Sequence, residues 1–222
     1  SANGHSPRPG MFTLAHALKP HGYRCFHQGH MHWNGEPNGY EPQTADGWVG
    51  RAQWHEAMPP AMLHRYEVEN AIRRTTGGPS PRRLEHYSGW FSMNRTIACI
   101  EEAARRGERF LAWCSFSEPH PPFYPPREFY ERIDQCQIEL PPPLPPGAPP
   151  QHPSVERKRE EWRHLTDVEK RQIIAGYHGL TSVLDVCVGG ILDALERLGL
   201  WDDTLIVMTC DHGDMLFENE LL

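Results

Sequence analysis

The spacing of apolar and polar residues predicts a first pair of helices and strands in the amino-terminal half of the chain. Apolar residues at helical spacing predict a short helix over 12–20, and a brief extended segment follows over 23–27. The same periodicity predicts a helix over 87–105 that Gly107 ends. A short apolar run over 110–116 then predicts a buried strand.

The carboxy-terminal third repeats this order of helix and strand. Apolar residues recur every three or four positions over 171–198, which predicts a long amphipathic helix ending at Gly199. The β-branched and apolar run 204–209, flanked by aspartates, predicts another buried strand. Helices placed between strands favour parallel crossover connections, so we expect one α/β unit.

Two segments do not fit this periodicity. The stretch from Gly29 to about Pro60 is rich in Gly, Pro, Asn and Trp, which predicts a long irregular excursion. Proline dominates residues 140–153 and forbids a helix or a central strand there, so we expect a proline-rich surface loop that acts as a spacer.

Composition excludes several classes of partner. The chain of 222 residues carries a formal net charge of -7, which argues against nucleic acid, and its uninterrupted apolar runs are too short to span a membrane. Six cysteines without CxxC spacing favour reduced thiols. Ser1 opens the chain without an apolar signal segment, so we expect that the true amino terminus has been removed. The cytoplasm is slightly favoured as compartment, and a homo-oligomer is left open.

Polar residues of the kinds that bind ligands follow each predicted strand. In order, they are His30 and His32, Glu118 and His120, and Asp211 and His212. Because open α/β sheets bind ligands at the carboxyl ends of their strands, we expect the three groups to meet at one edge.

Each group has more than one interpretation. Asp211 and His212 offer a carboxylate and an imidazole suited to a divalent metal, although an Asp that caps a turn beside a hydrogen-bonded His explains them equally well. His120 lies among prolines that hold the backbone, where it could transfer protons or serve a structural role. His30 and His32 form an HxH pair, which is also found at metal sites of unrelated hydrolases.

Three segments resemble the sulfatase family of the alkaline phosphatase superfamily. The stretch TSVLDVCVGGILDALERLGLWDDTLIVMTCDHGDM is similar to the family's long helix, strand and [ST]-x-DHG-[DE] motif. SFSEPHPPFYPP resembles the family's strand followed by PHxPF, and ALKPHGYRCFHQGHMH resembles L-x-x-x-GY-x-T-x-x-x-GKWH. The resemblance implies an alkaline phosphatase-like α/β fold, with a mostly parallel sheet sandwiched by helices, of which residues 1–222 form a partial catalytic domain.

The resemblance also implies roles for individual residues. Asp211 and His212 would bind a divalent metal, with Ca²⁺ favoured over Mn²⁺ or Mg²⁺. His32 and His120 would be catalytic, and His30 and His120 would contact a small-molecule sulfate ester. The family's formylglycine, made from Cys or Ser in C/S-x-P/A-x-R, has no counterpart in this sequence, so we expect the chain by itself to be inactive.

Two departures from the family pattern keep other functions open. The lysine of GKWH is His30 here, which replaces a permanent cation by a titratable group, and MLFENELL stands where relatives often have MLGDHGLL. A phosphonate monoester or phosphodiester hydrolase of the same superfamily is the nearest alternative enzyme. A non-catalytic remnant that binds a metal or an anion is the alternative outside enzymes.

Overall fold

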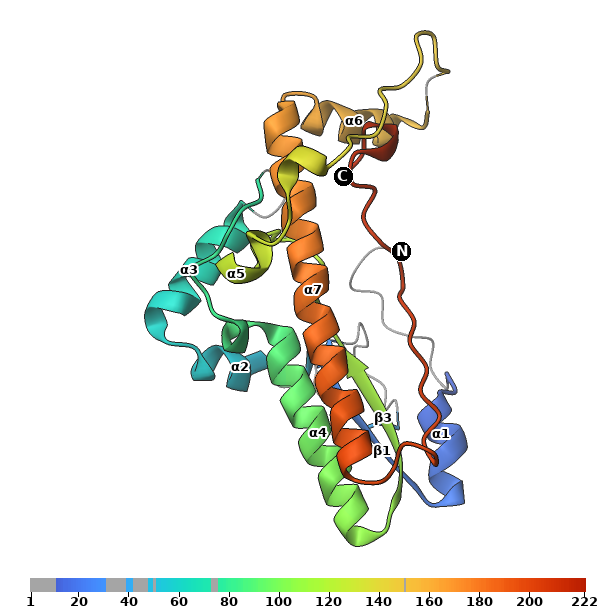
Figure 1. Ribbon diagram of the computed structural model, residues 1–222. Helices are drawn as coiled ribbons and strands as arrows, with labels where there is room; N and C mark the ends of the chain where they lie inside the picture. The colour runs from blue at the N-terminus through green and yellow to red at the C-terminus, as the bar shows by residue number, and fades with distance from the viewer. Residues whose placement is uncertain (1–10, 31–38, 42–47, 50, 73–75, 150) are drawn as a thin grey trace. The chain divides into compact units, whose positions relative to one another are not determined.

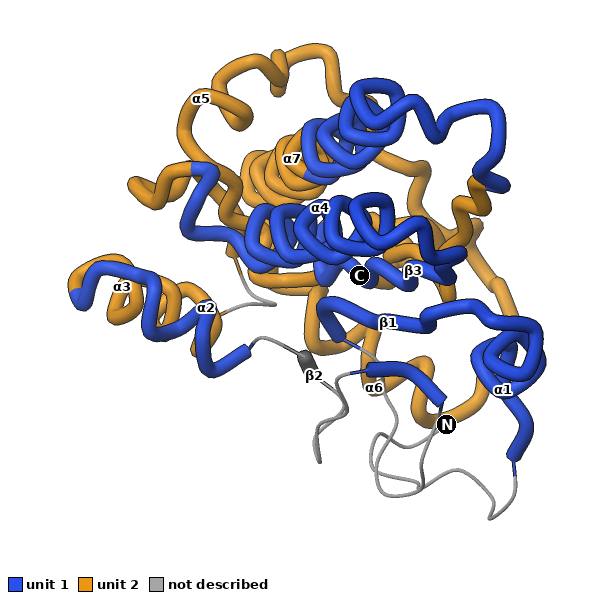
Figure 2. The backbone as a smooth tube through the Cα atoms, turned by 90° about the horizontal axis from the view of Figure 1, so that it is seen from below, with its two compact units in different colours: residues 1–60, 84–118, 184–205 blue, residues 61–83, 119–183, 206–222 orange. Residues whose placement is uncertain are grey.

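A computed structural model gives the fold, which is described for residues 11–30, 39–41, 48–49, 51–72, 76–149 and 151–222. Two compact units are distinguished in Figure 2. Unit 1 comprises residues 1–60, 84–118 and 184–205, and unit 2 comprises residues 61–83, 119–183 and 206–222. Each unit is assembled from segments far apart in the sequence.

Unit 1 is built on a three-stranded sheet in the order β2-β1-β3. Strand β1 (Tyr23–His30) pairs in parallel with β3 (Arg109–Ser115), in a register that runs from Tyr23 opposite Arg109 to Gly29 opposite Ser115. The short β2 (Trp48–Val49) pairs antiparallel with the end of β1. The parallel pairing confirms the prediction for the first two strands.

Helices cover both faces of this sheet, which explains why five consecutive residues of β1 are buried. Phe26 packs with Ile100 of α4 (Ser88–Arg106) and with Leu195 on one face. Cys25 points to the opposite face, as its place next to Phe26 requires, and packs with Ala15 of α1 (Leu14–Leu18) and Tyr40. Figure 1 shows α4 lying along the two parallel strands.

Unit 2 is helical and contains a buried ionic network. Glu69 of α3 (Pro60–Ala71) is fully buried and accepts hydrogen bonds from Ser80 Oγ (2.7 Å), Arg82 Nε (2.9 Å) and Arg65 Nε (2.8 Å). Because these donors satisfy the carboxylate, its burial is tolerated. The network fixes the segment around Ser80 against α3.

The remaining elements are short, apart from α7 (Asp167–Arg197), which contributes residues to both units. They are α2 (Arg51–Ala57), α5 (Arg127–Tyr130), α6 (Pro153–Trp162), and the 3₁₀ turns η1 (Lys19–His21), η2 (Leu84–His86), η3 (Gln135–Gln137) and η4 (Glu218–Glu220). Residues 140–149 form neither helix nor strand, and Pro153 opens α6.

Helix α7 meets the length and hydropathy criteria for a membrane-spanning helix, although its uninterrupted apolar runs are short. Its length and its mean hydropathy of 1.3 in the most apolar window suffice to cross a membrane. Core helices of soluble proteins meet the same two criteria, so one such helix is weak support for a membrane span. Ile173 and Val183 of α7 are fully buried within the protein, so part of its apolar surface is used in packing.

Two sequence predictions of local structure are wrong. Residues 204–209 form no strand, and Leu205, Val207 and Met208 are 89%, 75% and 76% exposed. A β-branched run becomes a strand only when a neighbouring strand accepts its backbone hydrogen bonds, and within the described residues none pairs with this run. The excursion predicted from Gly29 to about Pro60 contains β2 and α2 in its described part.

His27 on β1 is a buried histidine that burial keeps neutral. Its side chain is 2% exposed, and its Nε2 has no hydrogen-bond partner among the described residues. Loss of hydration lowers the pKa of His27 to about 4, and the nearby His30 adds to the effect. The unfolded chain has an ordinary histidine pKa of 6.5 and therefore binds the proton more readily than the folded chain.

We therefore expect His27 to make stability fall with decreasing pH between 6.5 and about 4. The contribution of neutral His27 to the free energy of unfolding is complete above pH 6.5. It is smaller by roughly 3 kcal/mol once His27 is protonated in both the folded and the unfolded chain. Urea unfolding at about pH 7 and pH 4.5 measures it. Between these two pH values the free energy of unfolding of His27→Gln, whose side chain cannot titrate, should fall by roughly 2–3 kcal/mol less than that of the parent protein. Equal losses in the two proteins would show that His27 is not responsible.

Candidate active site

The carboxyl ends of β1 and β3 lie at one edge of the sheet, where β1 ends in His30 and the chain that leads to His120 leaves β3. His30 is the last residue of β1, half-buried and opposite Trp48 of β2. Gly29 before it has a φ of +89°, and a Cβ there would lie 1.9 Å from the carbonyl oxygen of Ser115. Only glycine allows β1 and β3 to approach this closely just before His30.

The segment that carries His120 leaves the same edge after β3. His120 is exposed, and its Nδ1 lies 2.7 Å from the carbonyl oxygen of Pro121. With the proton on Nδ1 donated to that oxygen, Nε2 is the nitrogen that can accept or deliver a proton. The ring therefore has a defined orientation relative to its own backbone.

Backbone pairing with residues 77–80 holds the chain that follows His120. Gly78 N donates to Phe123 O (3.1 Å), Ser80 N donates to Pro125 O (2.8 Å), and Arg127 N donates back to Ser80 O (3.1 Å). Ser80 is itself held by the buried Glu69. The hydroxyl groups of Thr76 and Tyr124 add a short hydrogen bond between the two segments.

Two glycines of α7 let this same segment lie against the helix. A Cβ at Gly176 would lie 2.3 Å from Phe123 O, and one at Gly179 would lie 2.6 Å from Pro125 Cγ. The helix thus presents bare backbone where the segment crosses it. Periodicity predicted the helix, but these contacts involve residues about fifty positions apart and leave no local signal in the sequence.

Asp211 and His212 lie beyond the exposed run 204–209 and are themselves exposed, with side chains 83% and 72% accessible. Asp211 Oδ1 accepts a hydrogen bond from His212 N (2.9 Å), and Oδ2 lies 3.5 Å from His212 Nε2. The carbonyl of Gly213, which His212 Nδ1 contacts at 3.0 Å, raises the pKa of His212, and the Asp211 carboxylate raises it further.

The fit of these two residues to a divalent metal is partial. A hard carboxylate oxygen and an imidazole nitrogen are suitable donors, and with Nδ1 bonded to Gly213 O the ligating nitrogen would be Nε2. No group of three or more His, Cys, Asp or Glu side chains suited to a metal is assembled within the described residues. The pair therefore supplies part of a donor set.

The structure describes five of the six predicted site residues. His30 and Glu118 belong to unit 1, and His120, Asp211 and His212 belong to unit 2. His32 lies outside the described residues. The convergence of three strand ends is confirmed for β1 and β3 but not for the run before Asp211, which is not a strand.

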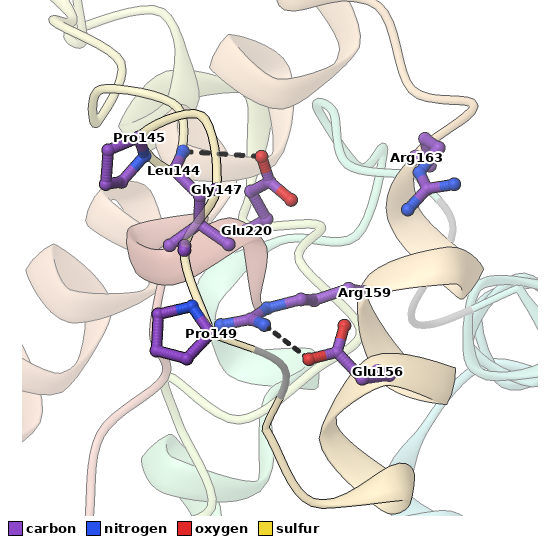
Figure 3. Close-up of a pocket in the computed structure, with 9 residues that line it drawn as sticks. Leu144, Pro145, Gly147, Pro149, Glu156, Arg159, Arg163 and Glu220 are labelled. Carbon is purple, nitrogen blue, oxygen red and sulfur yellow. Dashed lines mark hydrogen bonds and ion pairs between the residues drawn. The ribbon is translucent and has the colours of Figure 1, made fainter.

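A cavity of about 300 Å³ in unit 2 contains none of the predicted site residues. Figure 3 shows Arg159 between Glu156 and the proline-rich segment, with its Nη1 2.8 Å from the Glu156 carboxylate. Its Nε donates to Asn219 O (3.0 Å), and Glu220 accepts from Leu144 N (3.4 Å). These charged groups bind other groups of the protein itself, so we interpret the cavity as a result of the packing of α6 against the proline-rich segment.

Comparison with known proteins identifies the family. The sequence matches the sulfatase family over residues 2–222. The chain belongs to the sulfatase family.

Several curated proteins are similar in sequence to this sulfatase-family chain. PehA of Trinickia caryophylli, a multifunctional alkaline phosphatase superfamily protein, is 30% identical over an alignment of 196 residues, and the match covers 79% of this chain and 37% of PehA. Iduronate 2-sulfatase of Homo sapiens is 30% identical over an alignment of 142 residues, and the match covers 58% of this chain and 26% of that protein. The matched region thus spans only 37% and 26% of the lengths of these two relatives.

Solved structures confirm the alkaline phosphatase-like α/β fold of this sulfatase-family chain. A phosphonate monoester hydrolase from Silicibacter pomeroyi superimposes with a TM-score of 0.73 at 22% identity, covering 99% of this chain and 51% of that chain. The phosphonate monoester hydrolase of Agrobacterium radiobacter gives a TM-score of 0.68 at 20% identity, covering 97% and 50%. At these identities the likeness concerns the fold.

The close contact between Gly176 and the Phe123 backbone can be tested by substitution. Gly176→Ala should destabilise the protein by about 1–3 kcal/mol, because the added methyl group displaces the Phe123 backbone. Gly189→Ala in the same helix meets nothing within 4 Å and should stabilise it by about 0.5–1 kcal/mol. Denaturant unfolding of both variants measures the contrast. Equal stabilities would mean that the segment does not rest on α7 as described.

Proposed function

We propose that the protein to which this chain belongs is a metal-dependent hydrolase of sulfate esters. The observation that carries the proposal is the exposed Asp211-His212 pair, within a DHGD sequence, in a member of the sulfatase family. The anchored His120 segment supports it, because a histidine on a fixed backbone suits proton transfer.

In the proposed mechanism the histidines handle protons and bind the ester group. His120 has Nδ1 directed at its own backbone, which assigns Nε2 to the ester or its leaving group. His30, at the end of β1, is assigned to the anionic part of the substrate, which it binds most strongly when protonated. His32 is the second catalytic histidine in this proposal.

Asp211 Oδ and His212 Nε2 are the proposed metal ligands. These two residues would hold a divalent cation, with Ca²⁺ favoured, which would supply Lewis acidity for an ester oxygen. The raised pKa of His212 means that protons compete with the metal for this nitrogen as the pH falls. We also propose that the 222-residue chain by itself turns over no substrate, because it contains no C-x-P-x-R or S-x-P-x-R sequence.

One observation favours a second function, the hydrolysis of phosphonate monoesters or phosphodiesters. His30 stands where the sulfatase motif GKWH has lysine, so the positive charge at this position depends on pH. PehA, the relative named above, is described as multifunctional. The two functions share the proposed metal ligands and differ in the group that is attacked.

Rates with the intact protein on three aryl esters test these alternatives. We expect 4-nitrophenyl sulfate to be hydrolysed with a kcat/KM at least about tenfold above that for 4-nitrophenyl phenylphosphonate and bis(4-nitrophenyl) phosphate, a difference of about 1.4 kcal/mol in transition-state stabilisation. The opposite order would establish the second function. Hydrolysis of none of the three by metal-loaded protein would favour a binding remnant.

Replacing Asp211 tests the metal assignment. In the intact protein Asp211→Ala should lower the amount of metal bound per protein, which elemental analysis after dialysis measures. It should also lower kcat by at least about 100-fold. Asp203→Ala is the matched control, because it removes another exposed aspartate eight positions upstream. If Asp211→Ala retains its metal while His30→Ala loses it, the site is instead an HxH metal site.

A further inference from the structure

Glu118 is a buried carboxylate on the chain between β3 and His120. It is 9% exposed, and its Oε1 accepts hydrogen bonds from Ser88 Oγ (2.9 Å) and from Gly89 N (3.3 Å). Its Oε2 is buried without a hydrogen-bond partner among the residues that the structure describes. A carboxylate in this position loses most of its hydration, so the contacts that it makes must hold it firmly.

These contacts are made to the first turn of α4, which has no cap of its own. The N-cap residue Tyr87 makes no side-chain hydrogen bond to the helix, so Glu118 supplies the acceptor that Ser, Asp or Asn would normally provide. Its negative charge also suits the positive end of the helix dipole. A Cβ at Gly89 would lie 2.8 Å from Glu118 Oε2, which explains a glycine in this first turn.

The residues before and after His120 in the chain are each held within their own unit. Glu118, two residues before His120, is bound to the start of α4. Phe123 and Pro125, three and five residues after it, are hydrogen-bonded to Gly78 and Ser80. Pro119 and Pro121 restrict the few backbone angles that remain.

From this arrangement we infer that Glu118 is a positioning residue for His120. It fixes the point at which the chain leaves β3 and α4, and with it the backbone from which the His120 ring projects. The inference deepens the proposed function, since it rests on His120 being the proton-transfer residue. In the sequence Glu118 is only a polar residue that follows a predicted strand, and its role becomes visible in the buried hydrogen bond with Ser88, thirty residues earlier.

The experiment compares Glu118→Ala with Glu118→Gln by NMR of the ring of His120 in the full 222-residue chain. The Ala variant removes the acceptor, so the His120 Cε1–H signal, assigned with His120→Gln, should shift and broaden as the segment becomes heterogeneous. The Gln variant keeps an acceptor oxygen for Ser88 and Gly89 and should restore the parent signal and its pH titration. In the intact, active protein the Ala variant should lower kcat by roughly 10- to 100-fold with less effect on KM.

Gly107→Ala is the control for simple loss of helix stability. Gly107 ends α4 with a φ of +63° and has open space around it, so alanine there strains the backbone without touching Glu118. This variant should lower Tm but leave the His120 signal unchanged. The inference is overturned if Glu118→Ala lowers Tm while the His120 signal and titration stay as in the parent. A shifted signal with no turnover in any protein would retain the positioning role and reject the proposed hydrolase.

Discussion

The parallel pairing of β1 with β3 is the constraint on which the arrangement of unit 1 depends. Seven consecutive residue pairs, from Tyr23 opposite Arg109 to Gly29 opposite Ser115, bring together segments more than eighty residues apart in the sequence. Parallel strands end at the same edge of a sheet, so His30 and the segment after Ser115 emerge side by side. The close approach at Gly29 holds this register, since any side chain there would collide with the Ser115 backbone.

Helix α4 connects this sheet to the chemistry. Its apolar side packs on β1 through Ile100 and Phe26, and its first turn binds Glu118. One helix thus supports the strand that ends in His30 and also fixes the chain that leads to His120. The burial of Glu118 makes the second contact specific, because a carboxylate removed from water is stable only where donors meet it.

The two groups of candidate site residues differ in how firmly the structure holds them. His120 lies on a segment that backbone hydrogen bonds, a buried ionic network and two glycines of α7 keep in place. Asp211 and His212 follow an exposed run with no strand partner in the described part of the chain, and they contact mainly each other and Gly213. Within the described residues no group of three or more metal-binding side chains is assembled, so the pair is only part of a metal site.

The sequence by itself determined the elements that local periodicity encodes, and its motifs were sufficient to predict the family. The long helices α4 and α7 and the strands β1 and β3 were predicted within a few residues, because a buried face recurs along each of them. The motifs around His30, His120 and Asp211 predicted the sulfatase family, and the family match over residues 2–222 confirms this prediction.

Only the tertiary structure decided which of these segments meet. The run 204–209 has the composition of a strand, but a strand exists only when another backbone completes its hydrogen bonds, and composition does not contain that partner. The low pKa of His27 follows from burial against Tyr40, and the role of Glu118 follows from a helix that begins thirty residues earlier. Such effects arise from contacts between distant segments, so they leave no pattern in the local sequence.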